Sequence, residues 1–187
     1  MMDAEPDETL VALVAARDQL ALRILMERHM SRILRVAQRV VNNAADADDI
    51  GQEAFMRVWN HASSFDPATA RFTTWLYRIV LNLAFDQTRK PILRPLEEAA
   101  DVHSNDIAAV DRIIEWEQET MLVDALGVLP DRQRAAIALF HMEGLSGKDA
   151  AQAMELSEKA FESLLTRARR ALKQHVEHVR QRGRRYA

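Results

Sequence analysis

Apolar residues recur at steps of three and four along most of this chain, which is the spacing of one face of an α-helix. The first such run covers residues 7–41 and stops at Asn42, and two further runs predict helices over about 46–61 and 72–90. Gly and Pro number only five each among 187 residues, and both are unfavourable inside helices. No segment of useful length alternates apolar and polar residues as a strand would. The sequence therefore predicts an all-α fold.

A change in composition near the middle of the chain divides it into two parts. Residues 91–111 contain two prolines and no sustained apolar period, as is typical of a linker. The charges follow the same division: 11 basic and 12 acidic side chains in 1–90, 2 and 9 in 91–124, and 12 and 7 in 125–187. We therefore predict two small helical domains, 1–90 and 112–187, joined by an acidic, flexible linker over 91–111. The overall charge of −3 conceals a basic C-terminal part suited to an anionic partner.

Several classes of protein are disfavoured by what the sequence lacks. The chain has no cysteine, which excludes disulfides, thiolate zinc sites and a cysteine nucleophile. Its six histidines form no His-x-x-x-His or Glu-x-x-His pair on one predicted helix, so no metal site is expected. The acidic N-terminus lacks the form of a signal sequence, and no stretch approaches the roughly 18 apolar residues of a membrane span. We expect a cytoplasmic protein that is not an enzyme, with no cofactor, metal or small-molecule substrate and no direct membrane insertion.

Residues 144–172 have the form of a helix-turn-helix, with Ser146 and Ser157 as the predicted N-caps of its two helices. Glu155 stands in the turn where Gly is usual, and a left-handed backbone there costs a residue with a side chain about 1–2 kcal/mol. On the second helix the residues expected to face inward are Phe161, Leu164, Leu165, Ala168 and Leu172. The polar residues expected to face DNA are Ser157, Lys159, Glu162, Ser163, Thr166, Arg167 and Arg170. An ordinary amphipathic hairpin with a solvated charged face is the alternative interpretation.

Two parts of the chain resemble the extracytoplasmic-function (ECF) sigma factors of bacterial RNA polymerase. Sigma region 2 of that family is similar to DADDIGQEAFMRVW at 46–59 and to FTTWLYRIVLNLAFDQTRK at 72–90. Sigma region 4 is similar to LPDRQRAAIALFHMEGLSGKDAAQAM at 129–154, with the helix that follows it. The two segments occur in the family's order. The resemblance implies a subunit that binds the beta-prime and beta subunits of core RNA polymerase and directs promoter recognition, DNA melting and transcription initiation.

The resemblance also implies a role for each predicted element. The helix over 46–61 is the implied docking surface for core polymerase, through Asp48, Asp49, Gln52, Glu53 and Met56. The loop over 62–71 is the implied site that captures a base flipped from the non-template strand, and the helix over 72–90 reads the −10 promoter element. Their implied DNA-binding residues are Ser63, Ser64, Phe65, Asp66, Asn82, Asp86, Arg89 and Lys90. The polar face of the second helix of the helix-turn-helix is the implied reader of the −35 element.

The chain departs from the family pattern at two places. Leu81 stands where the family often has Arg, and Glu162-Ser163-Leu164-Leu165 stands where it often has Lys-Ser-Arg-Leu. Trp75 has the spacing of a core residue rather than of a base-stacking surface. A helix-turn-helix regulator that acts without core polymerase, its N-terminal half sensing a ligand or dimerising, is the second hypothesis. The family further implies control by an anti-sigma factor that covers the polymerase- and DNA-binding faces in the absence of stress.

Overall fold

A computed structural model describes residues 5–89 and 126–183, and in these ranges all regular elements are helical. The predicted all-α fold is therefore confirmed for these residues. The linker expected over 91–111 and the candidate residue Lys90 lie outside the described residues. The N-terminal domain consists of α1 (Asp7–Ala15), α2 (Gln19–Val41), α3 (Ala44–His61), the 3₁₀ turn η2 (Ala62–Ser64) and α4 (Phe72–Arg89). The C-terminal domain consists of α6 (Asp131–Ile137), the π-helical turn η3 (Ala138–Met142), α7 (Gly147–Ala153) and α8 (Glu158–Gly183).

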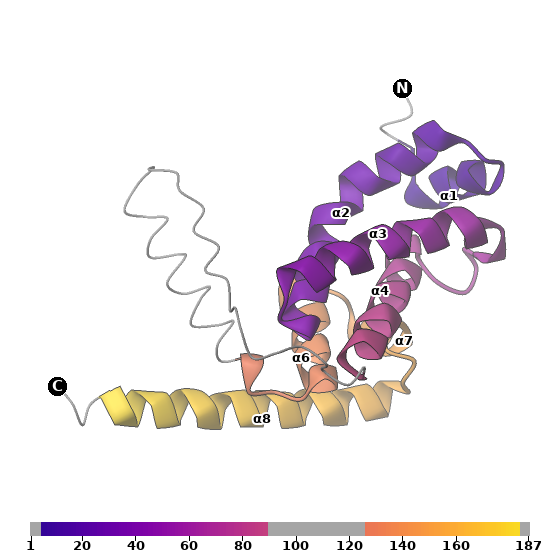
Figure 1. The fold of residues 1–187 in the computed structure, drawn as a ribbon. Coiled ribbons are helices and arrows are strands. Elements are labelled where there is room, and N and C mark those ends of the chain that lie inside the picture. The colour runs from indigo at the N-terminus through magenta and orange to yellow at the C-terminus, as the bar shows by residue number, and fades with distance from the viewer. Residues whose placement is uncertain (1–4, 90–125, 184–187) are drawn as a thin grey trace.

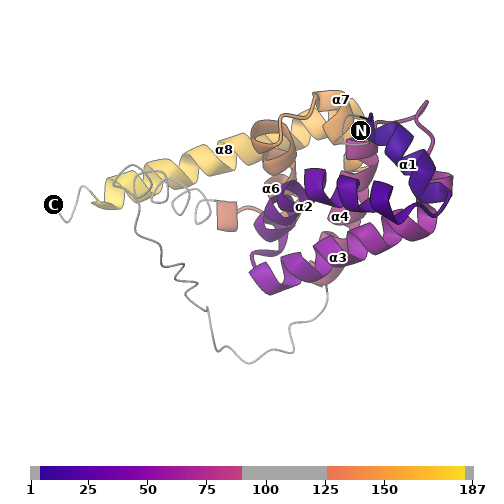
Figure 2. The ribbon, with the colours of Figure 1, turned by 90° about the horizontal axis from the view of Figure 1, so that it is seen from above.

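The two domains pack against each other rather than standing apart. Helices α1 to α4 form one bundle, and α6 and α7 lie against the side of that bundle made by α2 and α4 (Figures 1 and 2). Helix α8 runs along the far side of α6 and α7, and its C-terminal half extends past the other helices. The helix-turn-helix of the C-terminal domain therefore contacts the N-terminal bundle, and the described residues form a single body.

The prediction of one uninterrupted helical run over 7–41 is wrong, because the chain breaks between α1 and α2. Arg17 has a left-handed backbone with φ of 70°. Asp18 then caps α2, its carboxylate accepting hydrogen bonds from the backbone N–H groups of Leu20 at 2.8 Å and Ala21 at 3.1 Å. The apolar period continues across the break because α1 and α2 both face the same core. Periodicity alone therefore could not reveal the turn, although an Asp followed by apolar residues is an N-cap pattern.

The N-terminal core depends on a close approach of α2 and α3 at Gly51. A Cβ atom at this position would lie 2.6 Å from Cδ2 of Leu34 and 3.2 Å from Sδ of Met30. Phe72 is fully buried, and Trp75 is only 8% exposed, as predicted for a core residue. The tight packing fixes α3 on α2 and so fixes the outward face of α3.

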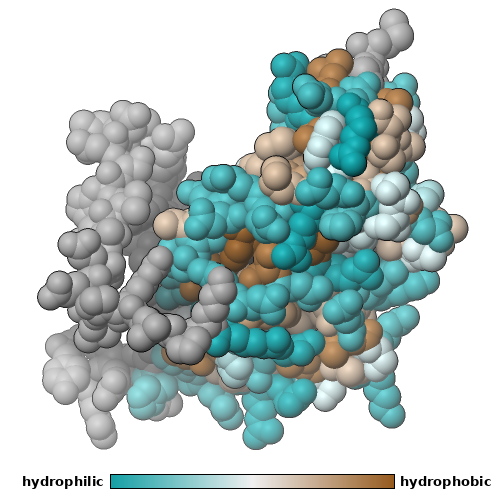
Figure 3. Space-filling model, turned by 45° about the vertical axis from the view of Figure 1, so that its right-hand side comes forward, coloured by the Kyte–Doolittle hydropathy of each residue, from teal (hydrophilic) through white to brown (hydrophobic). Residues whose placement is uncertain are grey.

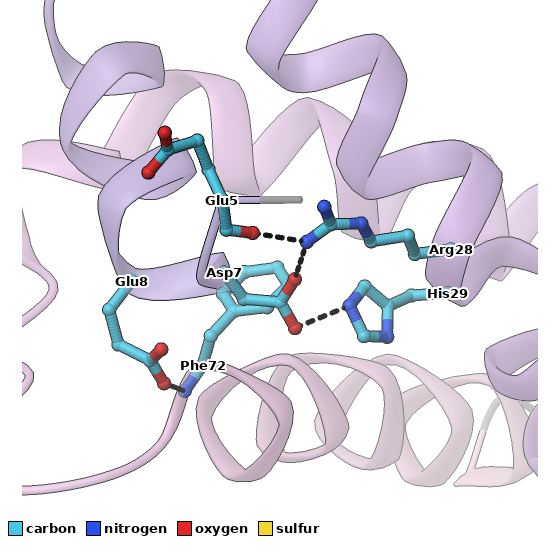
Figure 4. Close-up of polar contacts among 6 residues, drawn as sticks. All are labelled: Glu5, Asp7, Glu8, Arg28, His29 and Phe72. Carbon is cyan, nitrogen blue, oxygen red and sulfur yellow. Dashed lines mark hydrogen bonds and ion pairs between the residues drawn. The ribbon is translucent and has the colours of Figure 1, made fainter. Parts of the chain in front are cut away.

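A group of polar contacts fastens α1 to α2 and α4 (Figure 4). The Asp7 carboxylate accepts a hydrogen bond from Arg28 at 2.7 Å and lies 2.7 Å from Nε2 of the buried His29. Glu8 accepts a hydrogen bond from the backbone N–H of Phe72 at 3.2 Å. Burial acts to raise the pKa of Asp7, but the hydrogen bonds and positive charge of His29 and Arg28 outweigh it. The pKa of Asp7 therefore lies below its ordinary value of 3.8.

The helix-turn-helix has the predicted form, with one irregularity before it. Helix α6 continues into the π-helical turn η3, and the segment ends at Gly144, where φ is 70°. Ser146 caps α7 by accepting from the N–H of Asp149 at 3.0 Å, and Ser157 caps α8. Glu155 has the left-handed conformation expected from its position, with φ of 55°. Among the residues expected to face inward on α8, Phe161, Leu165 and Ala168 are buried, and Leu164 and Leu172 are half-buried.

Few large hydrophobic side chains of the described residues are exposed. Figure 3 shows a face that is mostly hydrophilic, with hydrophobic side chains gathered in a hollow near its centre. The large hydrophobic side chains that are exposed in the described ranges are Leu20, Met56 and Val128. No helix in the part of the chain that the structure describes is long and apolar enough to cross a membrane. The same residues bring together no cluster of three His, Asp or Glu side chains that could hold a metal ion.

Candidate functional site

The five residues expected to dock on core polymerase share the outward face of α3. Asp48, Asp49, Gln52, Glu53 and Met56 are all exposed. Met56 is 57% exposed, the largest exposed fraction among the three exposed large hydrophobic side chains of the described residues. Glu53 forms an ion pair with Arg57 at 3.0 Å on the same helix. The face therefore offers an exposed methionine bordered by acidic and amide groups.

A groove lies beside this face, between α2 and α3, and sequence reasoning missed most of its lining. Its volume is about 570 Å³, and it is lined by Gln19, Leu22, Met26, Gln52, Phe55, Met56 and Trp59. Two of these, Gln52 and Met56, belong to the predicted docking set. Trp59 is held by Arg17, whose guanidinium lies 5.2 Å from the ring centroid and donates to the Trp59 carbonyl at 3.2 Å. The apolar period of the first 41 residues was interpreted as core spacing, so it did not distinguish groove from core.

The loop between α3 and α4 is held in a defined shape. Ser64 Oγ donates to the His61 carbonyl at 2.7 Å, and the Asp66 carboxylate accepts from the N–H of Ala68 at 2.9 Å. Phe65 is half-buried, and its ring centroid lies 5.4 Å from that of Trp75. Phe65 therefore anchors the loop to the aromatic side chains of the core, and the polar groups of the loop remain at the surface.

A small cavity of about 70 Å³ opens at this loop. Three of the four predicted loop residues line it, namely Ser64, Phe65 and Asp66, whereas Ser63 is exposed but outside the lining. The lining residues that sequence reasoning missed as site residues are Thr69, Ala70, Thr74, Trp75, Arg78 and Gln152. Trp75 is thus both a core residue and part of the cavity wall. The contribution of Gln152 comes from α7 of the other domain, which no sequence pattern indicates.

The remaining candidates of the −10 set lie along α4. Asn82, Asp86 and Arg89 are exposed on one face of the helix, and Arg89 lies 3.7 Å from Asp86. An ion pair this exposed contributes little to stability. The helix has 18 residues and is therefore about 27 Å long, so the loop and Arg89 lie at opposite ends of it. The candidates form a track rather than one cluster. Leu81, the departure from the family pattern, is fully buried.

The predicted −35 face of α8 is exposed as expected, although two of its groups also have structural roles. The exposed residues are Ser157, Lys159, Glu162, Ser163, Thr166, Arg167 and Arg170. Ser157 Oγ accepts from the N–H of Ala160 at 3.2 Å, and Arg167 Nε donates to the Ser163 carbonyl at 3.3 Å. The face therefore combines three cations with one acidic residue.

Arg169, a further cation of α8, is engaged within the C-terminal domain. Its Nε donates to Nε2 of His141 at 3.0 Å, and its guanidinium lies 5.4 Å from the ring centroid of Phe140. Burial and the charge of Arg169 lower the pKa of His141. A neutral imidazole has the lone pair that accepts this hydrogen bond. Arg169 thus fastens α8 to the π-helical turn.

A buried carboxylate joins the two domains, and sequence reasoning missed it. The side chain of Glu143 is only 2% exposed. It accepts hydrogen bonds from Arg32 Nε and from the Tyr77 hydroxyl, both at 2.9 Å. Arg35 and Arg39 lie 3.9 and 3.8 Å from the same carboxylate. We call these five residues the Glu143 cluster.

The Glu143 carboxylate shifts the pKa values of two of its neighbours. The hydrogen bond with Glu143 raises the pKa of Arg32, and burial together with the Glu143 charge raises the pKa of Tyr77. Three arginines and a neutral phenol therefore surround one carboxylate. The available signal in the sequence is the stripe of Arg32, Arg35 and Arg39 at three- and four-residue steps on one helix, but it does not identify the partner.

Comparison with known proteins places the chain in a family. Residues 25–91 match sigma-70 region 2, and residues 119–172 match sigma-70 region 4. The RNA polymerase sigma-H factor of Pseudomonas aeruginosa is 32% identical over 185 residues, which cover 92% of this chain and 94% of that protein. The ECF RNA polymerase sigma factor SigM of Mycobacterium tuberculosis is 32% identical over 166 residues, which cover 89% and 82%. The chain therefore belongs to the ECF group of the sigma-70 family, as the two sequence segments predict.

Solved structures agree with this assignment. CnrH in complex with the cytosolic domain of CnrY has a TM-score of 0.72 at 28% identity, covering 93% of this chain and 99% of that one. The sigma factor RpoE from Bartonella quintana, in complex with the anti-sigma factor NepR, has a TM-score of 0.66 at 23% identity, covering 83% and 96%. The second likeness shows a shared fold. Both confirm the all-α architecture with a region 2 and a region 4 domain.

Proposed function

We propose that this chain binds core RNA polymerase and directs promoter recognition, DNA melting and transcription initiation. The observation that carries the proposal is that the two family segments fall on two helical domains, each with an exposed candidate face. No catalytic chemistry by the chain itself is part of the proposal. The subunit acts by binding, with region 2 in residues 1–90 and region 4 in residues 112–187, and it works in the cytoplasm with the polymerase.

The outward face of α3 and its groove are the proposed contact with the beta-prime and beta subunits. An apolar groove with a polar rim suits an interface that is specific but exchangeable. Met56 and Phe55 supply the apolar part, and Gln52 and the acidic side chains supply the rim. The large exposed fraction of Met56 supports this role, because such a side chain gains most from a partner that removes it from water.

The loop at residues 62–71 and the track along α4 are the proposed −10 site. Flipping a base out of the duplex costs a few kcal/mol of stacking and pairing. A cavity bordered by Ser64, Asp66 and Trp75 offers hydrogen bonds and an aromatic wall that offset this cost. Asn82 is suited to a base edge, and Arg89 and Lys90 are suited to phosphates. Melting in this scheme needs no nucleotide hydrolysis.

The polar face of α8 is the proposed −35 reader. Lys159, Arg167 and Arg170 supply positive charge for the DNA backbone, and Ser163 and Thr166 supply short hydrogen-bonding groups. We further propose that an anti-sigma factor controls the protein. The support is that RpoE, a structural neighbour, was solved with the anti-sigma factor NepR. The partner of this chain would cover the α3 groove or the DNA-binding faces.

Run-off transcription with core polymerase on a promoter library tests the proposal. We expect initiation from a restricted set of promoters, and only when both core polymerase and this chain are present. Specific binding of promoter DNA by the isolated protein, with no effect on polymerase, would instead favour a regulator that acts alone. An absence of promoter-specific initiation would overturn the proposal.

Arg89→Ala/Lys90→Ala tests the proposed phosphate contacts within the same assay. Each lost phosphate contact lowers the slope of log affinity against log salt by about 0.9, so we expect weaker promoter opening with a slope reduced by about 1 to 2. Arg23→Ala is the matched control, because Arg23 is equally exposed but lies on α2 in an ion pair with Glu27. An unchanged slope in the double variant would remove Arg89 and Lys90 from the site.

A further inference from the structure

The closed packing of the two domains conflicts with the spacing of the promoter elements that they are proposed to contact. The −10 and −35 elements lie about 25 base pairs apart, which is about 85 Å at 3.4 Å per base pair. DNA of this length behaves as a stiff rod, since its persistence length is about 150 base pairs. The two DNA-contacting faces must therefore stand far apart when both elements are bound.

In the structure these faces are close together. The Gln152 side chain of α7 donates a hydrogen bond to the Thr69 carbonyl of the α3–α4 loop at 2.9 Å. Helix α8 begins at Glu158, and the intervening chain reaches at most about 3.6 Å per residue. The start of α8 thus lies within about 30 Å of the loop. Gln152 also lines the cavity at the loop, so the C-terminal domain partly covers the proposed base-capture site.

The two domains share a continuous apolar core, and the ion pairs between them in the described residues converge on one carboxylate. Glu143 belongs to the C-terminal domain, whereas Arg32, Arg35 and Tyr77 belong to α2 and α4. The Arg32 guanidinium also donates to the Glu143 backbone carbonyl at 3.2 Å. A buried ion pair adds little net stability relative to solvated partners, but removing one member alone is costly. Domain separation can break such a contact, because it returns the charged groups to water. The contact is still specific while the domains are packed together.

We propose that the Glu143 cluster holds the free protein in a closed resting state, from which the domains must separate before both promoter elements are contacted. The need for separation rests on the proposed function, whereas the closed state rests on the contacts alone. Thirty-six residues separate the two described ranges, and a chain of that length can span at most about 120–130 Å, which is more than the separation requires. Core polymerase, by binding the two domains at distant places, supplies the energy that opens the cluster.

Spin labels on the two domains measure this directly, and the absence of cysteine from the chain makes the labelling specific. Ala12→Cys in α1 and Gln174→Cys in α8 place labels at exposed positions outside every proposed binding face. For the free protein we expect one narrow distance distribution. Glu143→Gln removes the charge at constant size, and we expect it to shift most of the population to longer and broader distances. Arg32→Gln is the second variant, and it should shift the distribution in the same direction.

The matched control is Glu27→Gln, which removes a carboxylate on α2 that pairs only with Arg23 in the same helix among the contacts of the described residues. It should leave the distribution narrow. A broad distribution in the parent protein would overturn the proposal, because the closed form would not be the resting state. A narrow distribution in both Glu143→Gln and Arg32→Gln would also overturn it. Circular dichroism verifies that each variant is folded, so that broadening reports separation rather than unfolding.

Addition of core polymerase separates this inference from the proposed function. We expect the parent protein to co-elute with core polymerase and its label distances to lengthen by tens of ångströms. Failure to co-elute would overturn the proposed function, while the measurements on the free protein would still decide the role of the Glu143 cluster. Co-elution without a change in distance would overturn the requirement for separation. The two failures are therefore distinguishable.

Discussion

Asp7→Asn is expected to destabilise the protein at neutral pH and to have little effect in acid. The Asp7 carboxylate connects α1 to α2 through two short contacts, to Arg28 and His29, each at 2.7 Å. Asn has the same shape as Asp but no charge. Its amide NH2 group would replace one carboxylate oxygen and would face an N–H donor of Arg28 or His29. The substitution therefore removes the charge assistance of both contacts and the acceptor of one of them.

The magnitude follows from the geometry of these contacts. A hydrogen bond to a charged group contributes about 1.5–3 kcal/mol net. The Asp7 side chain is 20% exposed, and Asn keeps one acceptor oxygen, so both factors reduce the loss. We expect the free energy of unfolding to fall by about 2 kcal/mol at pH 7.

The pH dependence has a definite sign. The pKa of Asp7 is lowered in the folded protein from its ordinary value of 3.8, so the unfolded chain takes up the proton at a higher pH than the folded chain. The stabilisation is therefore complete above 3.8 and is lost as the pH falls through the lower folded value. Asn at this position has no such dependence.

Urea unfolding of both proteins at pH 7, 5 and 3, followed by circular dichroism, measures the difference. We expect the gap between parent and variant to be equal at pH 7 and 5 and to shrink at pH 3. Glu27→Gln, which breaks an exposed ion pair, should change stability little at every pH. A loss of unfolding free energy in Asp7→Asn that is absent at pH 7, or equally large at pH 3, would refute the conclusion that the ionised Asp7 carboxylate stabilises the packing of α1 on α2.

Two further perturbations test local features. Glu155→Gly should raise the free energy of unfolding by about 1 kcal/mol because it relieves a left-handed backbone, whereas Ala160→Gly, in the exposed first turns of α8, should lower it by about 0.5–1 kcal/mol; thermal unfolding decides, and a loss in both would contradict the strain at Glu155. Met56→Glu should weaken binding to labelled core polymerase several-fold without lowering the melting temperature. Val128→Glu is its control, since Val128 is similarly exposed, at 51% against 57%, but lies in the other domain, and equal losses would remove Met56 from the docking face.

The sequence predicted the helices best where caps and periodicity agree. The helices expected over 46–61 and 72–90 correspond to α3, Ala44–His61, and α4, Phe72–Arg89. Ser146 and Ser157 were predicted as caps because a hydroxyl before a helical run satisfies backbone donors that have no partner within the helix. These interactions join residues that are close in the sequence, so the sequence alone can predict them. The break at Arg17 was missed because two helices that face one core preserve a single apolar period.

The site was predicted unevenly for the same reason. Exposed faces such as that of α3 follow from helical geometry once the core stripe is known. The lining of the α2–α3 groove and the contribution of Gln152 to the loop cavity depend on which helices meet, and no local pattern contains that. Glu143 lies more than a hundred residues from Arg32 in the sequence. A stripe of arginines on a helix is ordinarily a solvated face, so only the packing reveals a common partner.

Some cations of α8 have structural roles and others face outward, and this difference affects how this sigma factor would discriminate among promoters. Arg169 is engaged by His141 and Phe140, and Ser157 by the helix N-terminus, so the basic charge of the C-terminal part overstates what faces DNA. Cations without a bidentate partner mainly hold phosphates, which position a protein without reading sequence. The loop and α4 offer a cavity wall and Asn82, which are the groups suited to bases. The proposed −35 contact would therefore supply mostly affinity, and the proposed −10 contact most of the sequence preference.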